Sequence, residues 1–307
     1  DALPIQDMKK TDYASTVPGV MHACGHDGHT SALLGAAELL AGTRQSWTGS
    51  VRLLFQPAEE MPPGGATAMI RDGALEGVDE IYGIHLWSRF PSGTVQTSAG
   101  PVMAAAYEFT VVIKGKGGHG GLPHQSVDAV MAAAQFVVNA QTIVSRNADP
   151  VLPHVLSFGS IHGGTTFNVI ASECKLQGTV RTMTRESRNF MKERLEEVLE
   201  NTCRIFGASY RLDYAMGYPP VVNHETQTER AMRLAAERFG EQAVVRCRPL
   251  MAAEDFAYYL ERIPGCFLFV GAGTDEINAP HHHPQFDIDE SALAVSVQLL
   301  YDLATKS

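Results

Sequence analysis

Long hydrophobic runs are absent from this sequence. No stretch approaches the roughly 20 consecutive apolar residues that a membrane-spanning helix requires, and no charged segment followed by an apolar one opens the chain as a secretory signal would. These absences argue against a membrane protein and against export. We therefore expect a cytoplasmic protein that has no membrane as a partner.

Cysteine and positive charge are both in short supply. The five cysteines are odd in number, widely spaced and form no Cys-X-X-Cys pair, which argues against a disulfide framework and a structural zinc ribbon. The formal net charge is −10, so Coulomb repulsion disfavours nucleic acid and anionic membrane surfaces. We expect a reducing compartment and no nucleic-acid partner.

Apolar residues, in contrast, make up 45% of the 307 positions and suffice for a large core, most simply in two domains. The first part of the chain alternates strand and helix patterns, which is typical of a mostly parallel sheet. The expected elements are an apolar, buried helix over residues 32–40 capped by Thr30 or Ser31, a strand over 50–55, a helix over 66–73 and a strand over 80–84.

The pattern changes at about residue 105. Strand, helix, strand, strand, helix and strand then follow one another, which is the order of a ferredoxin-like split unit. The α/β alternation resumes after this segment. We therefore expect an α/β fold in which residues 1–104 and 217–307 form one mostly parallel-sheet domain, with a ferredoxin-like (βαββαβ) domain inserted over residues 105–216.

The stretch over residues 21–29, MHACGHDGH, places one cysteine and three histidines within nine positions. Thiolate and imidazole are ligands of zinc, cobalt, nickel and manganese-like ions. Cys24 and His26 are separated only by Gly25, which gives the backbone freedom to direct both at one point. The alternative is a loop whose polar residues cap the following helix.

Two adjacent glutamates, Glu59 and Glu60, follow the expected strand over 50–55, and His85 follows the strand over 80–84. Ligands of open α/β sheets collect outside the carboxyl ends of the strands. Because successive side chains of extended backbone point in different directions, one glutamate can bind metal while the other faces water. The sequence alone leaves open which does which, and a solvated surface turn is the alternative.

The candidates together suit two divalent ions rather than one. A two-metal site needs about this number of ligands, one of which is shared, with a further carboxylate available for proton transfer. The set is Cys24, His26, Glu60, His85 and His282, with Glu59 beside them.

Motifs along the whole chain resemble one family, the N-acyl-amino-acid amidohydrolase branch of the dinuclear metallopeptidases, which includes hippurate hydrolases, aminoacylase-like enzymes and plant auxin-conjugate hydrolases. A series of this length is far more specific than any single motif. The matching motifs are DALPI (1–5), MHACGHDGHTSALLGAA (21–37), LLFQPAEE (53–60), GIHLW (83–87), GKGGHGGLPH (115–124), FNVI (167–170), GTVRT (178–182), AAEDFAYYL (252–260) and HHHPQFDIDE (281–290).

The resemblance implies a role for each candidate. Glu59 would be the general acid/base, and Cys24 would bridge two divalent ions, of Zn, Mn, Co or Ni. His282 is preferred among three consecutive histidines because the family's ligand stands two residues before the proline, here Pro284. The implied ligands are Cys24, His26, Glu60, His85 and His282.

The resemblance also assigns the inserted domain as a lid or dimerisation domain, and it implies a homodimer or higher homo-oligomer. His119, His124 and Asn168 of that domain would contact the substrate or its oxyanion, with ordinary loop structure as the alternative. Asp1 would orient a ligand of the metal site. Relatives carry a further segment before DALPI, so the N-terminal part of the catalytic domain is expected to be missing here.

The expected activity is hydrolysis of the amide bond of a small N-acyl amino acid by a metal-activated water with Glu59 as general base. A dipeptidase or carboxypeptidase with the same metal chemistry is the alternative within the class. An inactive metal-binding interaction protein is a second alternative, since Met61, Pro62 and Pro63 replace the family's usual glycines beside the glutamates. A cysteine nucleophile, Cys24 with His26, is a third.

Overall fold

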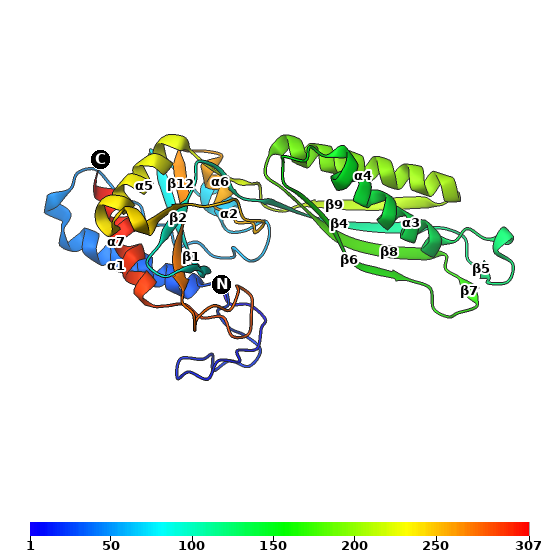
Figure 1. Ribbon diagram of the computed structural model, residues 1–307, viewed down its shortest axis with the longest axis horizontal. Helices are drawn as coiled ribbons and strands as arrows, with labels where there is room; N and C mark the ends of the chain where they lie inside the picture. The colour runs from blue at the N-terminus through cyan, green and yellow to red at the C-terminus, as the bar shows by residue number, and fades with distance from the viewer. Residues whose placement is uncertain (307) are drawn as a thin grey trace. The chain divides into compact units, whose positions relative to one another are not determined.

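The computed structural model describes residues 1–306, which form a mixed α/β fold in two compact units (Figure 1). Unit 1 comprises Asp1–Val102, Val221–Pro249 and Asp255–Ser307. Unit 2 comprises Met103–Pro220 and Leu250–Glu254. The central segment of the chain thus folds by itself, between two segments that fold together.

A four-stranded sheet in the order β1-β12-β2-β11 forms the centre of unit 1. Its longest strands, β1 (Ile81–Pro91) and β12 (Gly265–Gly273), pair in parallel although they lie far apart in the sequence. The short strands β2 (Val95–Thr97) and β11 (Val244–Arg246) also pair in parallel, whereas β12 and β2 are antiparallel. Most pairings in this sheet are therefore parallel.

Helices cover this sheet because its central strand is apolar on both faces. Every residue of β12 is buried, as expected of a strand enclosed between layers. The long helices of the unit are α1 (His26–Gly42), α5 (Glu225–Phe239) and α7 (Ser291–Thr305), and the short ones are α2 (Ala66–Arg71) and α6 (Ala257–Leu260).

Unit 2 is an antiparallel sheet packed on two helices. The sheet has the order β6-β8-β4-β9, and every pairing in it is antiparallel. On helix α4, Met191, Leu195 and Leu199 recur at helical spacing and are fully buried against the sheet. The elements are β4 (Ala105–Lys114), α3 (Ala129–Thr142), β6 (His154–Gly163), β8 (Glu173–Thr182), α4 (Arg185–Phe206) and β9 (Ser209–Met216).

Smaller elements complete the chain. Strands β5 (Gly118–His119) and β7 (Val169–Ile170) form a two-stranded sheet, as do β3 (Gly100–Met103) and β10 (Val221–Asn223). Short helical turns are η1 (Arg44–Ser46), η2 (Pro123–Gln125), η3 (Ile143–Asn147) and η4 (Glu241–Ala243).

The prediction of a strand over residues 50–55 is wrong. These residues adopt no strand structure, because a strand is stabilised by main-chain hydrogen bonds to a neighbour and no strand pairs with them in the part of the chain that the structure describes. The predicted strand–helix–strand unit therefore lacks its first strand. Helix α2 and strand β1 occur close to their predicted positions.

Two other boundaries differ from the prediction. Strand β1 continues through His85 to Pro91, because Leu86 and Trp87 find partners in Val270 and Gly271 of β12. Helix α1 begins at His26 rather than after Thr30, and its exposed Leu34 shows that it is buried on one face only.

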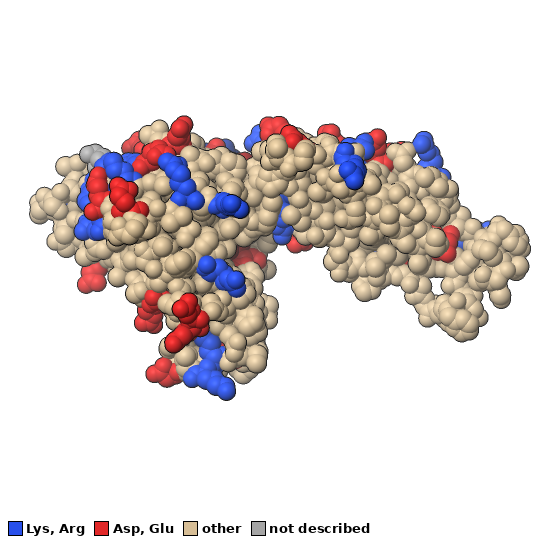
Figure 2. All heavy atoms as spheres, viewed as in Figure 1, with Lys and Arg blue, Asp and Glu red and all other residues tan. Residues whose placement is uncertain are grey.

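Charge is unevenly distributed over the surface. On the face drawn in Figure 2, acidic and basic side chains intermingle over much of unit 1, whereas the area over strands β6 and β8 is nearly free of both. The sequence of β6, HVLSFGSIHG, contains no Lys, Arg, Asp or Glu. Among residues 1–306, no helix combines the length and the apolar character needed to cross a membrane.

Candidate metal centre

Two glycines bring the start of helix α1 onto strand β1. Gly25 adopts the left-handed conformation (φ 83°) that turns the chain into the helix. A Cβ atom at Gly28 would stand 2.5 Å from Cδ1 of Leu86, so any larger residue would require the Leu86 side chain to move, and glycine permits this close approach without such a shift. Cys24, just before the helix, is thereby placed with its Sγ 3.7 Å from Nε2 of His85.

The protonation of the His85 ring follows from its hydrogen bond. Its Nδ1 lies 2.8 Å from the carbonyl oxygen of Leu86, which can only accept, so Nδ1 carries the proton. The lone pair is then on Nε2, the atom that faces Cys24. Burial lowers the pKa of His85 well below its ordinary value, so the ring is neutral, as metal ligation requires.

Asp1 holds the turn that carries the paired glutamates. Its two carboxylate oxygens accept the N–H groups of Ala58 at 2.9 Å and of Glu60 at 3.0 Å. Ala58 has a positive φ of 64°, a conformation that a non-glycine residue keeps only where its surroundings fix it. The Asp1 carboxylate thus fixes the backbone from which both glutamates extend.

Asp255 fixes the same loop from its other side. Nε2 of Gln56 donates to the two oxygens of this buried carboxylate, at 2.7 and 2.8 Å. One of these oxygens also accepts the N–H of Ala66 at 3.0 Å. Tyr259 donates its hydroxyl to Oε1 of Gln56 at 2.8 Å. The AAEDFAYYL motif therefore positions the QPAEE motif.

Glu60 is paired with His282. His282 Nε2 lies 3.0 Å from Glu60 Oε1, and this hydrogen bond raises the pKa of His282. Burial acts to raise the pKa of Glu60, but the hydrogen bond and charge of His282, together with His26 and Cys24, lower it by more in sum, so the pKa is lowered. His282 has a positive φ of 63° and donates its N–H to the Ala23 carbonyl at 2.7 Å, which joins the late loop to the Cys24 segment.

Glu59 has a different electrostatic environment from Glu60. Burial, together with the neighbouring Glu60 charge, raises the pKa of Glu59 to about 8. Its Oε2 lies 3.7 Å from Nε2 of His26, and burial lowers the pKa of His26 to about 4. Glu59 is thus a carboxyl group able to exchange a proton near neutral pH.

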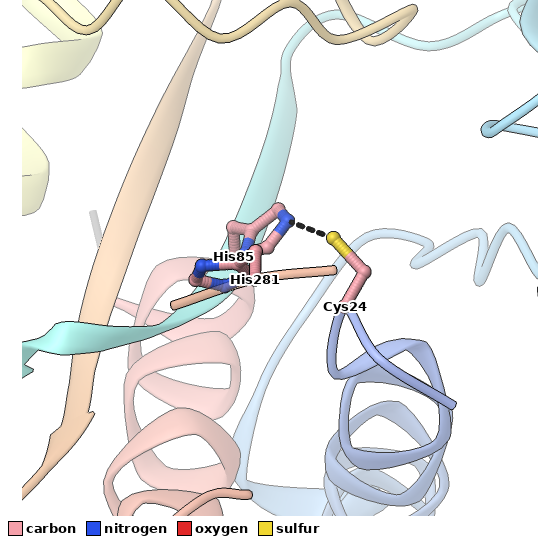
Figure 3. Close-up of side chains that lie close together, drawn as sticks. All are labelled: Cys24, His85 and His281. Carbon is pink, nitrogen blue, oxygen red and sulfur yellow. Dashed lines mark hydrogen bonds between the residues drawn. The ribbon is translucent and has the colours of Figure 1, made fainter. Parts of the chain in front are cut away.

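The side chains form groups whose donor atoms lie within 4.8 Å of one another. Cys24 belongs to two of them, which fits a shared ligand. Thiolate, imidazole and carboxylate donors at such separations suit divalent ions such as zinc, so the residues fit a metal centre. Three of the groups are Cys24, Glu60 and His282; Cys24, His85 and His281 (Figure 3); and His26, Glu59 and Glu60.

His281 is a candidate that the sequence reasoning missed. The spacing to Pro284 favours His282, yet the structure groups His281 with Cys24 and His85. The run of three histidines was the only signal in the sequence, and it could not say which rings turn inward. His281 is partly buried, whereas His282 and His283 are exposed.

The three candidates of unit 2 lie together at one loop region. Gly120 donates its N–H to the Asn168 carbonyl at 2.7 Å, and strands β5 and β7 pair beside it, so His119 and Asn168 are neighbours. His124 lies on the adjoining turn η2. All three are exposed, and Phe167 next to Asn168 is 99% exposed.

Comparison with known proteins identifies relatives along the whole chain. The model of peptidase family M20/M25/M40 matches residues 1–306. The N-acetyl-L-cysteine deacetylase of Bacillus subtilis (strain 168) is 45% identical over 306 residues, which cover 100% of this chain and 72% of that protein. Thermostable carboxypeptidase 2 of Saccharolobus solfataricus is 38% identical over 297 residues, covering 95% of this chain and 75% of that protein.

A solved structure shows the same arrangement. The YXEP protein of Bacillus subtilis, described as a dinuclear metal binding peptidase of the M20 family, superposes with a TM-score of 0.85 at 37% identity. The match covers 99% of this chain and 78% of that one. These matches confirm the resemblance found in the sequence and the assignment of the chain as a hydrolase.

Proposed function

Because the chain belongs to peptidase family M20/M25/M40, we propose that it hydrolyses the amide bond of N-acyl amino acids, giving a carboxylate and a free amino acid. The observation that carries the proposal is the position of Glu59: a proton-exchanging carboxyl group with a pKa of about 8, next to grouped metal-ligand side chains. A relative named for deacetylation of N-acetyl-L-cysteine supports this substrate class.

Five side chains would hold two divalent ions, with Cys24 shared between them. The ions would supply Lewis-acid polarisation of the carbonyl and a lowered pKa of water. Burial keeps the His26 and His85 rings neutral and so available as donors. The proposed ligands are Cys24, His26, Glu60, His85 and His282, and the ions are Zn, Mn, Co or Ni.

Glu59 would act as the general base and then as the general acid. Its carboxylate accepts a proton from the attacking water and delivers it to the leaving nitrogen, which would otherwise depart as an unstable anion. The contact with His26 and the fixed turn at Ala58 hold the carboxylate in place. Asp1 keeps this turn in position through its bonds to the backbone.

Unit 2 would serve as the inserted lid or dimerisation domain, with His119, His124 and Asn168 binding the substrate or its oxyanion. Strand β6 is an edge strand of the sheet in its unit, and it contains no Lys, Arg, Asp or Glu. Uncharged edge strands lack a common protection against pairing with another chain, which supports a homodimer. Sedimentation of the purified chain would test this; a monomer at all concentrations would contradict it.

The function is tested by a hydrolysis screen. The purified chain is assayed on N-acetyl and N-benzoyl amino acids and on matched dipeptides, with added Zn²⁺, Mn²⁺, Co²⁺ or Ni²⁺. We expect release of free amino acid from acyl substrates, loss of activity with a chelator and recovery with metal. Activity that survives chelation would instead indicate a Cys24 nucleophile.

A dipeptidase or carboxypeptidase remains the second candidate, since one relative is a carboxypeptidase. Faster cleavage of dipeptides or of a C-terminal residue than of any acyl amino acid would favour it. Metal uptake without hydrolysis of any substrate would contradict both proposals and indicate an interaction protein.

A further inference from the structure

The peptide groups of Leu86 are bonded by histidine side chains. Its N–H donates to Nε2 of His29 at 2.9 Å. Its carbonyl oxygen faces Nδ1 of His85 at 2.8 Å and Nε2 of His281 at 3.1 Å. Strand β1 stands at one end of its sheet order, and buried backbone groups on the open side of such a strand need partners from elsewhere.

The donor and acceptor roles of the Leu86 backbone groups determine which nitrogen of each of the three rings is protonated or unprotonated. A carbonyl oxygen only accepts, so His85 carries its proton on Nδ1 and His281 carries one on Nε2. A backbone N–H only donates, so Nε2 of His29 is unprotonated. The carbonyl has two lone pairs and can accept both donors.

The His281 ring is held rigidly by its neighbours. It packs against Trp87 with ring centroids 4.3 Å apart and the ring planes tilted by 35°, and its centroid lies 5.0 Å from that of the Phe286 ring. It also meets the His85 ring edge-on at 5.2 Å. The donor that reaches Leu86 is therefore fixed by packing.

We propose that His281 is a positioning residue whose Nε2–H holds the Leu86 carbonyl, and thereby keeps the His85 ring in the orientation that presents Nε2 beside Cys24. The inference rests on the proposed metal-dependent function. Groups that orient a ligating histidine from behind typically change metal affinity by roughly 10- to 100-fold when removed. His281 acts through Leu86 and His85 and does not itself have to touch the ion.

Two substitutions at one position separate donation from packing. His281→Phe keeps an aromatic ring against Trp87 but removes the N–H donor. His281→Gln keeps an N–H donor. His283→Gln is the matched control, because His283 is exposed in the same loop and its ring accepts only the N–H of Gln285 in the described structure.

The measurement is a Co²⁺ titration of the whole chain, followed by the thiolate-to-cobalt absorption band and checked by bound-metal analysis. We expect two ions in every form, with the affinity of one lowered roughly 10- to 100-fold in His281→Phe, partly restored in His281→Gln and unchanged in His283→Gln. Equal thermal unfolding of the metal-free forms would show that folding is intact.

Two results would overturn the inference while leaving the proposed function standing. One is an unchanged affinity in His281→Phe. The other is loss of a whole ion with an altered absorption band, which would make His281 a ligand. If the unaltered chain binds no ion at all, the proposed metal-dependent function fails as well, so the two failures are distinguishable.

Discussion

The two units of this protein bury different kinds of side chain. The core cluster of unit 2 consists of apolar residues and cysteines, which come mainly from helices α3 and α4 and from strands β4, β6 and β8, with partly buried residues of β9 packed against it. Unit 1 buries His85, Asp255 and Asp302 as well, whereas unit 2 buries one acidic residue, Glu254, among the described residues. Each of the three in unit 1 is bonded: Asp302, for example, accepts two hydrogen bonds from Arg238, at 2.6 and 2.7 Å. Burying these polar groups in unit 1 costs desolvation free energy. Such buried ionisable groups are typical of functional sites.

Cysteine shows the difference most clearly. Cys203 lies in the apolar core of unit 2, where burial raises its pKa to about 11, so it remains a thiol and packs as a small apolar residue. Cys24 is also buried, yet it is grouped with histidine and glutamate donors. Burial alone therefore does not decide the role of a cysteine; the neighbouring side chains do.

The largest effect should come from Glu59→Gln, which removes the proton-exchanging group of unit 1 and keeps its size. We expect hydrolysis to fall by about 10²- to 10⁴-fold while the bound metal stays near two ions. Steady-state rates and metal analysis measure both. Glu38→Gln, at an exposed position of helix α1, should change neither. Substantial turnover by Glu59→Gln at full metal occupancy would remove Glu59 from the mechanism.

A paired substitution at the two cysteines tests the contrast between the units directly. Cys24→Ala should weaken metal binding on the order of 100-fold or more, because a shared ligand is lost. Cys203→Ala should leave metal binding unchanged and lower the free energy of unfolding by about 1 kcal/mol. Metal titration and denaturant unfolding are measured on both variants. Equal metal affinities in the two would contradict the role given to Cys24.

The smallest effect is expected from Asn168→Ala, in the exposed loop region of unit 2. Loss of one hydrogen bond to the substrate should lower kcat/KM by about tenfold, with metal affinity and unfolding unchanged. Asn189→Ala on helix α4, also exposed, is the control. If both variants retain full kcat/KM, the loop is ordinary surface structure, and all the residues that act on the substrate belong to unit 1.

The sequence predicted the elements of unit 2 well, because the strands and helices there carry a regular apolar pattern, as the buried positions of β4 and α4 show. It failed at residues 50–55, where a β-rich pattern found no partner strand among the described residues. It also ended strand β1 too early. The partners that extend that strand, Val270 and Gly271, lie 184 positions after Leu86 and Trp87, and no local pattern reveals such pairing.

The sequence by itself identified the family, and it predicted the paired glutamates and the donor types of the candidate site, although not His281. Only the tertiary structure could show that Glu59 and Glu60, adjacent in sequence, differ in pKa, because the difference comes from burial and from His282, more than 200 positions later. Only the tertiary structure, likewise, could show that the His281 ring points toward the Leu86 carbonyl oxygen. Hydrogen bonds and desolvation depend on which groups meet in space, and residue order does not specify that before the chain folds.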